Sequence, residues 1–232
     1  IATYTFSDAR WQLRSAGFRN PFDLAFWEAE LFTYDSDMEW DLGMPWYRPT
    51  RICHVTSGSE FGWRTGSGKW RVSFPDNLPP VVSMLQGSPT ALLSGKELAF
   101  PEAYQDGIFA ADWSFGTLYF VHLEAEGATF TGSRTPFLSG TPLPLADMIA
   151  GPDGNLYFVS GGRELESGLY RLRPEKAVPD GTTAIAGTPG TSSETQSSTE
   201  PARLRKSFET FHTQIAGSED LDRLWKGLSH PD

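Results

Sequence analysis

Three observations in the sequence predict an all-β fold that is part of a β-propeller. Aromatic residues make up 13% of the chain, and 23 glycines and 17 prolines are spread along it. Aromatic side chains favour strands, whereas glycine and proline favour turns, so this mixture suits short strands joined by turns. A pattern of short strands and turns also occurs three times, and such repeats are typical of propeller blades.

The three copies of the pattern begin at Asn20, Ser88 and Leu145. Each contains a short apolar strand, a turn with acidic or glycine residues, and an aromatic-rich strand such as ELFTY, GIFAADW or NLYFVS. Asp23 and Asp147 hold matching places 124 residues apart (147 − 23), with the middle copy between them, which implies a period of roughly 60 residues. The PDG turn at 152–154 lies between two apolar runs and predicts a hairpin.

Residues 1–178 are therefore predicted to be the C-terminal part of a propeller with about three blades. Propellers close with about four to eight blades, and three blades leave open sheet edges. The chain begins IATYTFSDARWQ, without Met and already in strand-like alternation. We therefore expect either that further blades precede this segment in a parent protein or that the chain is a piece cut from one.

The composition changes after Val178. Residues 179–202 are rich in Gly, Ser, Thr and Pro, which predicts a flexible linker. Residues 203–232 predict two short amphipathic helices, because apolar residues recur at helical spacing in each half. The two stripes are Leu204, Phe208, Phe211 and Ile215, then Leu221, Leu224, Trp225 and Leu228. We interpret this pair as the start of an α-helical repeat region.

The composition also excludes several classes of protein. The formal net charge is −10 at pH 7, and nucleic-acid binders usually carry the opposite sign, so no nucleic-acid partner is expected. No run of 18 apolar residues occurs, so no membrane span is predicted in this chain. The single cysteine, Cys53, excludes an intrachain disulfide and is expected to be a small buried residue.

The stretch YDSDMEWD places four carboxylates at every second position: Asp35, Asp37, Glu39 and Asp41. In a strand these side chains share one face, where like charges destabilise the sheet. A divalent cation would relieve the repulsion, and carboxylate oxygens suit Ca²⁺. Asp35, Asp37 and Glu39 are therefore candidate calcium ligands. The alternative is a solvated acidic edge that discourages pairing with another strand.

Arg19 and Asn20 form a second candidate site. Pro21 favours extended geometry at Asn20, so the pair is expected at the mouth of a blade, where it would bind carboxylates or a polar substrate. The alternative is an ordinary turn, since Asn-Pro often begins one. Trp113 closes an aromatic strand after Asp112 and faces either the central channel or the core. His54 has no second His near it in sequence and is interpreted as structural.

Taken together, several segments resemble the quinoprotein sugar dehydrogenases of the glucose/sorbosone type. They are GFRNPFDLAF, SGSEFGWR, AFPEAYQDGIFAADWSFGTLYFVHL and AGPDGNLYFVSGG with SGLYRL, within roughly residues 10–173. The resemblance implies a six-bladed propeller that binds pyrroloquinoline quinone (PQQ) and Ca²⁺ over its central channel. The chain is most similar to large secreted bacterial proteins in which HEAT-like helical repeats and a c-type haem domain follow the propeller, which implies a periplasmic or secreted location.

The resemblance also implies roles for individual residues. Arg19 and Asn20 match a pair near the cofactor, and Trp113 matches a strand end that contacts it. Residues 33–41 fall where the family has a Glu-x-Gly-Pro calcium loop, and side-chain carboxylates would replace its Gly-Pro carbonyls here. Two family features have no match: an Arg-x-Arg pair for the quinone carboxylates, where this chain has 142–147, and a Lys after the strand that ends in Asp112 and Trp113.

The resemblance implies that the whole protein oxidises a sugar or polyol, passing electrons to PQQ and then to a cytochrome. The catalytic His of the family belongs to an earlier blade, so this chain alone is expected to be inactive. Loss of the Arg pair removes charge-assisted hydrogen bonds worth about 1.5–3 kcal/mol each. The alternative is a non-catalytic propeller that binds a glycan or a partner protein.

Overall fold

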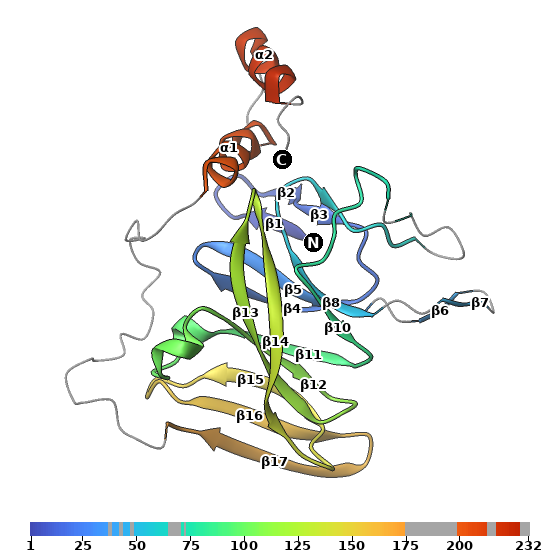
Figure 1. Ribbon diagram of the computed structural model, residues 1–232, viewed down its shortest axis with the longest axis vertical. Coiled ribbons are helices and arrows are strands. Elements are labelled where there is room, and N and C mark those ends of the chain that lie inside the picture. The colour runs from blue at the N-terminus through green and yellow to red at the C-terminus, as the bar shows by residue number, and fades with distance from the viewer. Residues whose placement is uncertain are drawn as a thin grey trace.

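The computed structural model describes residues 1–36, 39–41, 44–46, 49–64, 71, 73–174, 199–212 and 217–227, with the backbone alone for 39–41 and 44–46. Three antiparallel sheets follow one another down the molecule (Figure 1). The predicted all-β fold, a partial propeller of about three blades without a closed sheet, is confirmed.

Two of the blades have four strands and the third has three. The first blade consists of β4 (Pro21–Trp27), β5 (Glu30–Asp35), β8 (Thr50–His54) and β10 (Val82–Leu85). The second consists of β11 (Pro89–Ser94), β12 (Gly107–Asp112), β13 (Thr117–Glu126) and β14 (Thr129–Ser139). The third consists of β15 (Leu145–Ala150), β16 (Leu156–Gly162) and β17 (Leu165–Leu172).

The predicted repeat is present in the geometry of the first strands. Asp23 and Asp147 are the third residues of β4 and β15, and each Oδ1 accepts the backbone N–H of the following residue, at 2.7 and 2.8 Å. The strand β11 contacts both β4 and β15, so the three first strands lie side by side. Asp23 joins the first two blades, because its Oδ2 accepts the N–H of Leu92 at 2.8 Å.

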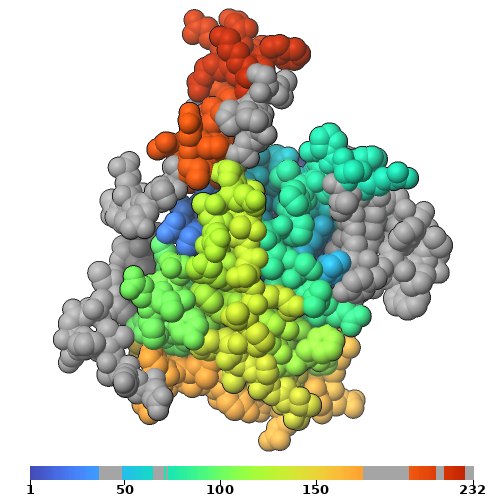
Figure 2. All heavy atoms as spheres, in the orientation of Figure 1, coloured from blue at the N-terminus to red at the C-terminus, as the bar shows by residue number. Residues whose placement is uncertain are grey.

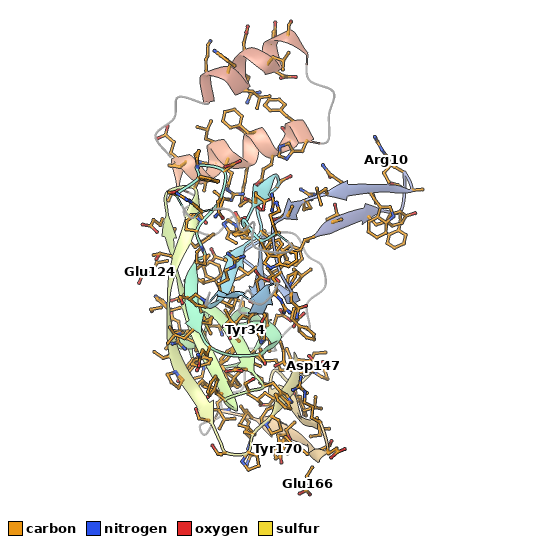
Figure 3. The ribbon with its side chains drawn as sticks, turned by 90° about the vertical axis from the view of Figure 1, so that its right-hand side faces the viewer. Arg10, Tyr34, Glu124, Asp147, Glu166 and Tyr170 are labelled. Carbon is orange, nitrogen blue, oxygen red and sulfur yellow. The ribbon has the colours of Figure 1, made fainter. Side chains whose placement is uncertain are left out.

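Shorter strands in the described residues form two-stranded sheets apart from the blades. The strand β1 (Ala2–Thr5) pairs with β2 (Arg10–Leu13), β3 (Ser15–Ala16) with β9 (Ser59–Glu60), and β6 (Glu39–Asp41) with β7 (Met44–Trp46). The 3₁₀ turns η1 (Gly95–Glu97) and η2 (Glu102–Tyr104) lie between β11 and β12. The β1–β2 hairpin projects away from the blades, with Arg10 at its tip (Figure 3).

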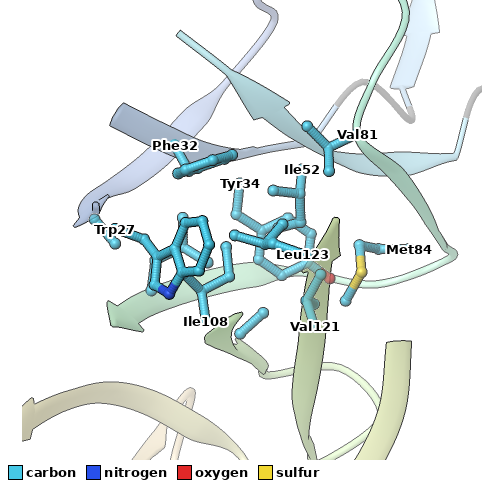
Figure 4. Close-up of a cluster of buried hydrophobic side chains, with 12 residues drawn as sticks. Trp27, Phe32, Tyr34, Ile52, Val81, Met84, Ile108, Val121 and Leu123 are labelled. Carbon is cyan, nitrogen blue, oxygen red and sulfur yellow. The ribbon is translucent and has the colours of Figure 1, made fainter. Parts of the chain in front are cut away.

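Two hydrophobic clusters hold the blades together. Side chains of β5 and β8, including Phe32, Tyr34 and Ile52, face Ile108 and Val121 of the second blade (Figure 4). A second cluster lies between the second and third blades and includes Phe109, Phe120, Leu145, Leu156 and Phe158. Each fully buried side chain of this size contributes about 1.5–3 kcal/mol, so these interfaces are the main source of stability. Cys53 is buried, as predicted.

The helical segment begins earlier than predicted. The helix α1 spans Glu200–Glu209, so three residues of the predicted 179–202 linker are helical. Thr199 caps the helix, since its Oγ1 accepts the N–H of Ala202 at 3.2 Å, and Pro201 suits the first turn. The 3₁₀ turn η3 (Thr210–His212) and α2 (Ser218–Gly227) follow. None of the helices that the structure describes is long and apolar enough to cross a membrane.

Candidate functional site

The ends of the second strands form one edge of the three blades. Asp35 pairs with Pro21, Asp112 with Pro89 and Ser160 with Leu145, so these positions are equivalent. The next residue in each blade donates its N–H to a carbonyl just before the first strand. These bonds are Ser36 to Asn20 at 3.2 Å, Trp113 to Ser88 at 3.0 Å and Gly161 to Pro144 at 2.9 Å. We call residues 19–20, 35–36, 88, 112–114, 144 and 160–163 the loop edge.

In the first blade, a buried ion pair organises the loop edge. Asp35 Oδ2 accepts hydrogen bonds from Arg51 Nε at 3.1 Å and Nη2 at 2.8 Å. Asp35 Oδ1 accepts the backbone N–H groups of Arg19 at 3.2 Å and Asn20 at 2.9 Å. These four donors are about as many as a carboxylate accepts. The structure therefore brings three predicted residues together, but it joins Asp35 to Arg51, which the sequence did not single out.

The predicted calcium site is described only in part. Asp35 uses its oxygens for Arg51 and the two backbone N–H groups. The side chains of Asp37 and Glu39 lie outside the described residues. Within the described part of the chain, no group of three His, Cys, Asp or Glu residues is placed to hold a metal ion. The described donors thus do not make a calcium site by themselves, and the role of Asp37 and Glu39 stays a prediction.

In the second blade, the equivalent carboxylate has fewer partners. Asp112 Oδ1 accepts the N–H groups of Ser88 at 2.7 Å and Ser114 at 2.9 Å. Thr117 pairs with Asp112 as Arg51 pairs with Asp35, so no guanidinium comes from that position. Asp112 Oδ2 is buried without a hydrogen-bond partner. Burial raises the pKa of Asp112, because a charged carboxylate is poorly solvated there.

Trp113 links the second and third blades. Its indole Nε1 donates to the carbonyl oxygen of Gly161 at 2.8 Å. The guanidinium carbon of Arg163 lies 5.1 Å from the centre of the indole ring, a cation–π distance. An open hollow of about 470 Å³ in the third blade is lined in part by Ser160, Gly161 and Ser167. Trp113 therefore lies at the loop edge, and the core alternative is not what the structure shows.

Arg163 is a site residue that the sequence analysis missed. It forms a two-residue turn with Glu164, in which φ is 50° and 66°, between strands paired at Gly162 and Leu165. Such turns usually contain Asn-Gly or Asp-Gly, because both residues have positive φ. The signal in the sequence was the short GGRE segment between two apolar runs, which predicts a tight hairpin without showing where its arginine lies.

Chemically, the loop edge offers binding groups. Asn20 is exposed, Arg19 and Trp113 are half-buried, and Arg163 is exposed. An amide, an indole and a guanidinium suit a planar or hydroxylated ligand with a carboxylate. The residues that define the loop edge include no histidine, so a general base of the usual kind is not among them.

His54 lies at the other end of the first blade. Its Nε2 is 3.0 Å from Glu30 Oε2, its Nδ1 is 2.9 Å from Thr129 Oγ1, and its ring stacks on Phe32 at 5.2 Å. Although burial alone would raise it, the pKa of Glu30 is lowered to about 2 by hydrogen bonds from His54 and Lys206 and by the charge of Arg205. These contacts agree with the interpretation of His54 as structural.

Comparison with known proteins identifies the fold. No family model and no curated protein matches the chain. A solved glucose dehydrogenase matches it with TM-score 0.57 and 18% identity, over 71% of this chain and 46% of that one. Another glucose dehydrogenase gives TM-score 0.54 and 18% identity, over 73% and 49%. A putative oxidoreductase (glucose dehydrogenase) from Thermus thermophilus gives 0.53 and 23%, over 68% and 46%.

The chain thus spans a little under half the length of the glucose dehydrogenases it matches. At these identities the likeness concerns the fold. This chain has the β-propeller fold of the glucose dehydrogenases over about three blades.

Proposed function

We propose that the chain is part of a quinoprotein sugar dehydrogenase-like domain, and that the loop edge faces its cofactor. The whole protein would oxidise a sugar or polyol and pass electrons to PQQ and then to a cytochrome. The observation that carries the proposal is the loop edge itself. Asp35 holds the backbone of Arg19 and Asn20 at the start of β4, and Trp113 lies at the equivalent strand end of the next blade.

The described residues fit PQQ in part. The exposed Arg163 would bind a carboxylate of the ligand, and Trp113 together with Asn20 would contact its ring and carbonyl groups. Arg51 is not available for this role, because it is paired with Asp35. When bound, PQQ would supply the two-electron acceptor. Calcium binding is proposed for Asp35, Asp37 and Glu39, with Asp35 the least available of the three because it is paired with Arg51.

The general base for sugar oxidation would come from a blade outside this chain. We therefore expect no sugar oxidation by the chain alone. A c-type haem domain as electron acceptor and a periplasmic or secreted location are proposed only from the resemblance to large secreted proteins.

The proposal is tested by restoring upstream blades from a parent protein and measuring PQQ-dependent reduction of a dye with a panel of aldoses. Turnover that depends on both PQQ and Ca²⁺ and falls in Trp113→Ala is expected. A folded protein that binds PQQ and oxidises no sugar would contradict the proposed reaction.

The second candidate is a non-catalytic propeller that binds a glycan. It is favoured by the lack of histidine among the loop-edge residues and by the single exposed guanidinium there. Glycan-array binding by the intact chain, without turnover in the dye assay once the upstream blades are restored, would distinguish it from the dehydrogenase.

A further inference from the structure

A second polar cluster, at the end of β5 opposite to the loop edge, holds helix α1 against the sheets. Glu30 is the first residue of β5, and Asp35 is the last. In Figure 2, α1 rests against the tip of the long β13–β14 hairpin. We call Glu30, His54, Ser57 and residues 127–129 the helix socket.

Charged groups make the central contact. Glu30 Oε1 accepts from Arg205 Nη2 and from Lys206 Nζ, both at 2.7 Å, while its Oε2 is held by His54. Arg205 also donates from Nε to the carbonyl oxygen of Ala128 at 2.8 Å, in the turn of the hairpin. One carboxylate thus binds two adjacent cationic side chains of the same helix.

Hydrogen bonds on both sides extend this contact. Thr199, the N-cap of α1, donates from Oγ1 to the carbonyl oxygen of Gly127. At the C-terminal end of the helix, Glu209 Oε1 accepts the N–H of Ser57 at 3.3 Å, and Ser57 Oγ is 2.6 Å from His212 Nδ1 in η3. Gln12 of the β1–β2 hairpin donates to the carbonyl oxygen of His212 at 2.9 Å. The socket therefore contacts α1 and η3 along their length.

The contact contains little apolar burial. No residue of α1 is buried, and neither hydrophobic cluster contains a residue of α1. The sheets therefore complete their cores without the helix. Glu30 is buried, but Arg205 is half-buried and Lys206 is exposed. The ion pairs therefore remain open to screening by salt, unlike a hydrophobic contact.

We infer that the helix socket is a docking site for a basic helix, which α1 occupies as a separable segment held by charge. The occupant is α1 of the same chain, recognised through the adjacent Arg205 and Lys206. There are 24 residues between Pro174 and Thr199 (199 − 174 − 1). Among the described residues, the ion pairs and hydrogen bonds of the socket hold α1 against the sheets.

The test uses the intact chain with a protease recognition sequence inserted between residues 185 and 195. After cleavage, the piece carrying α1 and α2 should co-elute with the sheets at 50 mM NaCl on size-exclusion chromatography. Raising NaCl to 500 mM should weaken its binding by about 10-fold or more, because partly exposed ion pairs are screened. Far-UV circular dichroism checks that the sheets remain folded.

Two substitutions in α1 provide a matched comparison. Lys206→Gln removes a cation that contacts Glu30 and should weaken binding of the cleaved piece by about 5-fold. Arg203→Gln removes the same charge from an exposed position of the same helix, where the side chain forms no hydrogen bond or ion pair with the described residues. It should change binding by less than about 2-fold.

Glu30→Gln gives the reciprocal test on the socket and should abolish the difference between Lys206→Gln and Arg203→Gln. Immediate loss of the cleaved piece at 50 mM NaCl would overturn the inference. So would binding that withstands 1 M NaCl, or equal effects of the two substitutions in α1.

Discussion

Asp35 and Asp112 occupy the same position in neighbouring blades, but their carboxylates have different hydrogen-bond partners. Each carboxylate accepts two backbone N–H groups through Oδ1: those of Arg19 and Asn20 for Asp35, and those of Ser88 and Ser114 for Asp112. Asp35 also receives a guanidinium from the adjacent strand, whereas Asp112 has Thr117 there and a buried oxygen without a partner. An Asp at this position thus binds backbone N–H groups of the loop edge in both blades. The cationic partner, Arg51, occurs in the first of the two blades.

The largest loss of stability is expected from removing Arg51, the cationic partner of Asp35. Arg51→Met removes the cation that pairs with the buried Asp35 carboxylate and should lower the free energy of unfolding by about 3–5 kcal/mol. Denaturant unfolding measures the loss. The double variant Asp35→Asn/Arg51→Met should recover part of it, and equal losses in the single and double variants would contradict a charge-based explanation.

A smaller loss of stability is expected at Trp113, whose indole N–H links the second blade to Gly161 of the third blade. Trp113→Phe keeps an aromatic ring but removes the N–H that donates to Gly161, and should cost about 1 kcal/mol. Urea unfolding at neutral pH measures it. Arg163→Gln, which removes only the cation–π contact, serves as the control and should cost about 0.5 kcal/mol.

The smallest effect at neutral pH is expected at Asp112. Asp112→Asn keeps an oxygen for the two N–H groups and removes a charge whose Oδ2 accepts no hydrogen bond, so stability should change by less than about 1 kcal/mol. The same substitution at Asp35 removes the carboxylate charge that Arg51 Nε and Nη2 bind, and should be clearly more costly. Similar losses of stability at the two positions would contradict the predicted difference between Asp35 and Asp112.

The raised pKa of Asp112 should also make the stability of the protein depend on pH. Because burial raises the pKa of Asp112, the folded state binds this proton more tightly than the unfolded state. The contribution of Asp112 to stability is therefore fully present below its ordinary pKa of 3.8 and is lost as pH rises through the raised value. Relative to the unmodified protein, Asp112→Asn should gain stability over that rise, as followed by thermal unfolding from pH 3.5 to 8. A constant difference would contradict the raised pKa.

Much of the fold was predictable because it depends on local patterns. Aromatic-rich strands, the PDG turn and the matching places of Asp23 and Asp147 mark the blades along the chain. The sequence also marks the start of α1, since Thr199 followed by Pro201 is typical of a helix N-terminus. Composition alone placed residues 199–202 in the linker, because it does not take account of the order in which Thr199 and Pro201 occur.

The candidate site was predictable only in part. The acidic run suggested one shared role for its carboxylates, but Asp35 lies at the end of β5 and faces Arg51, 16 residues away. That pairing depends on the register between β5 and β8. Glu30 and Arg205 are 175 residues apart, so their contact leaves no local signal either. Contacts of this kind are set by tertiary packing.

The proposed binding of the cofactor at the loop edge can be measured by titrating PQQ, with and without Ca²⁺, into the isotope-labelled chain while recording backbone amide NMR shifts. We expect saturable shifts centred on residues 19–20, 112–114 and 161–163, reduced in Arg163→Gln. Shifts centred on the helix socket, or no saturable shift from a folded sample, would contradict it.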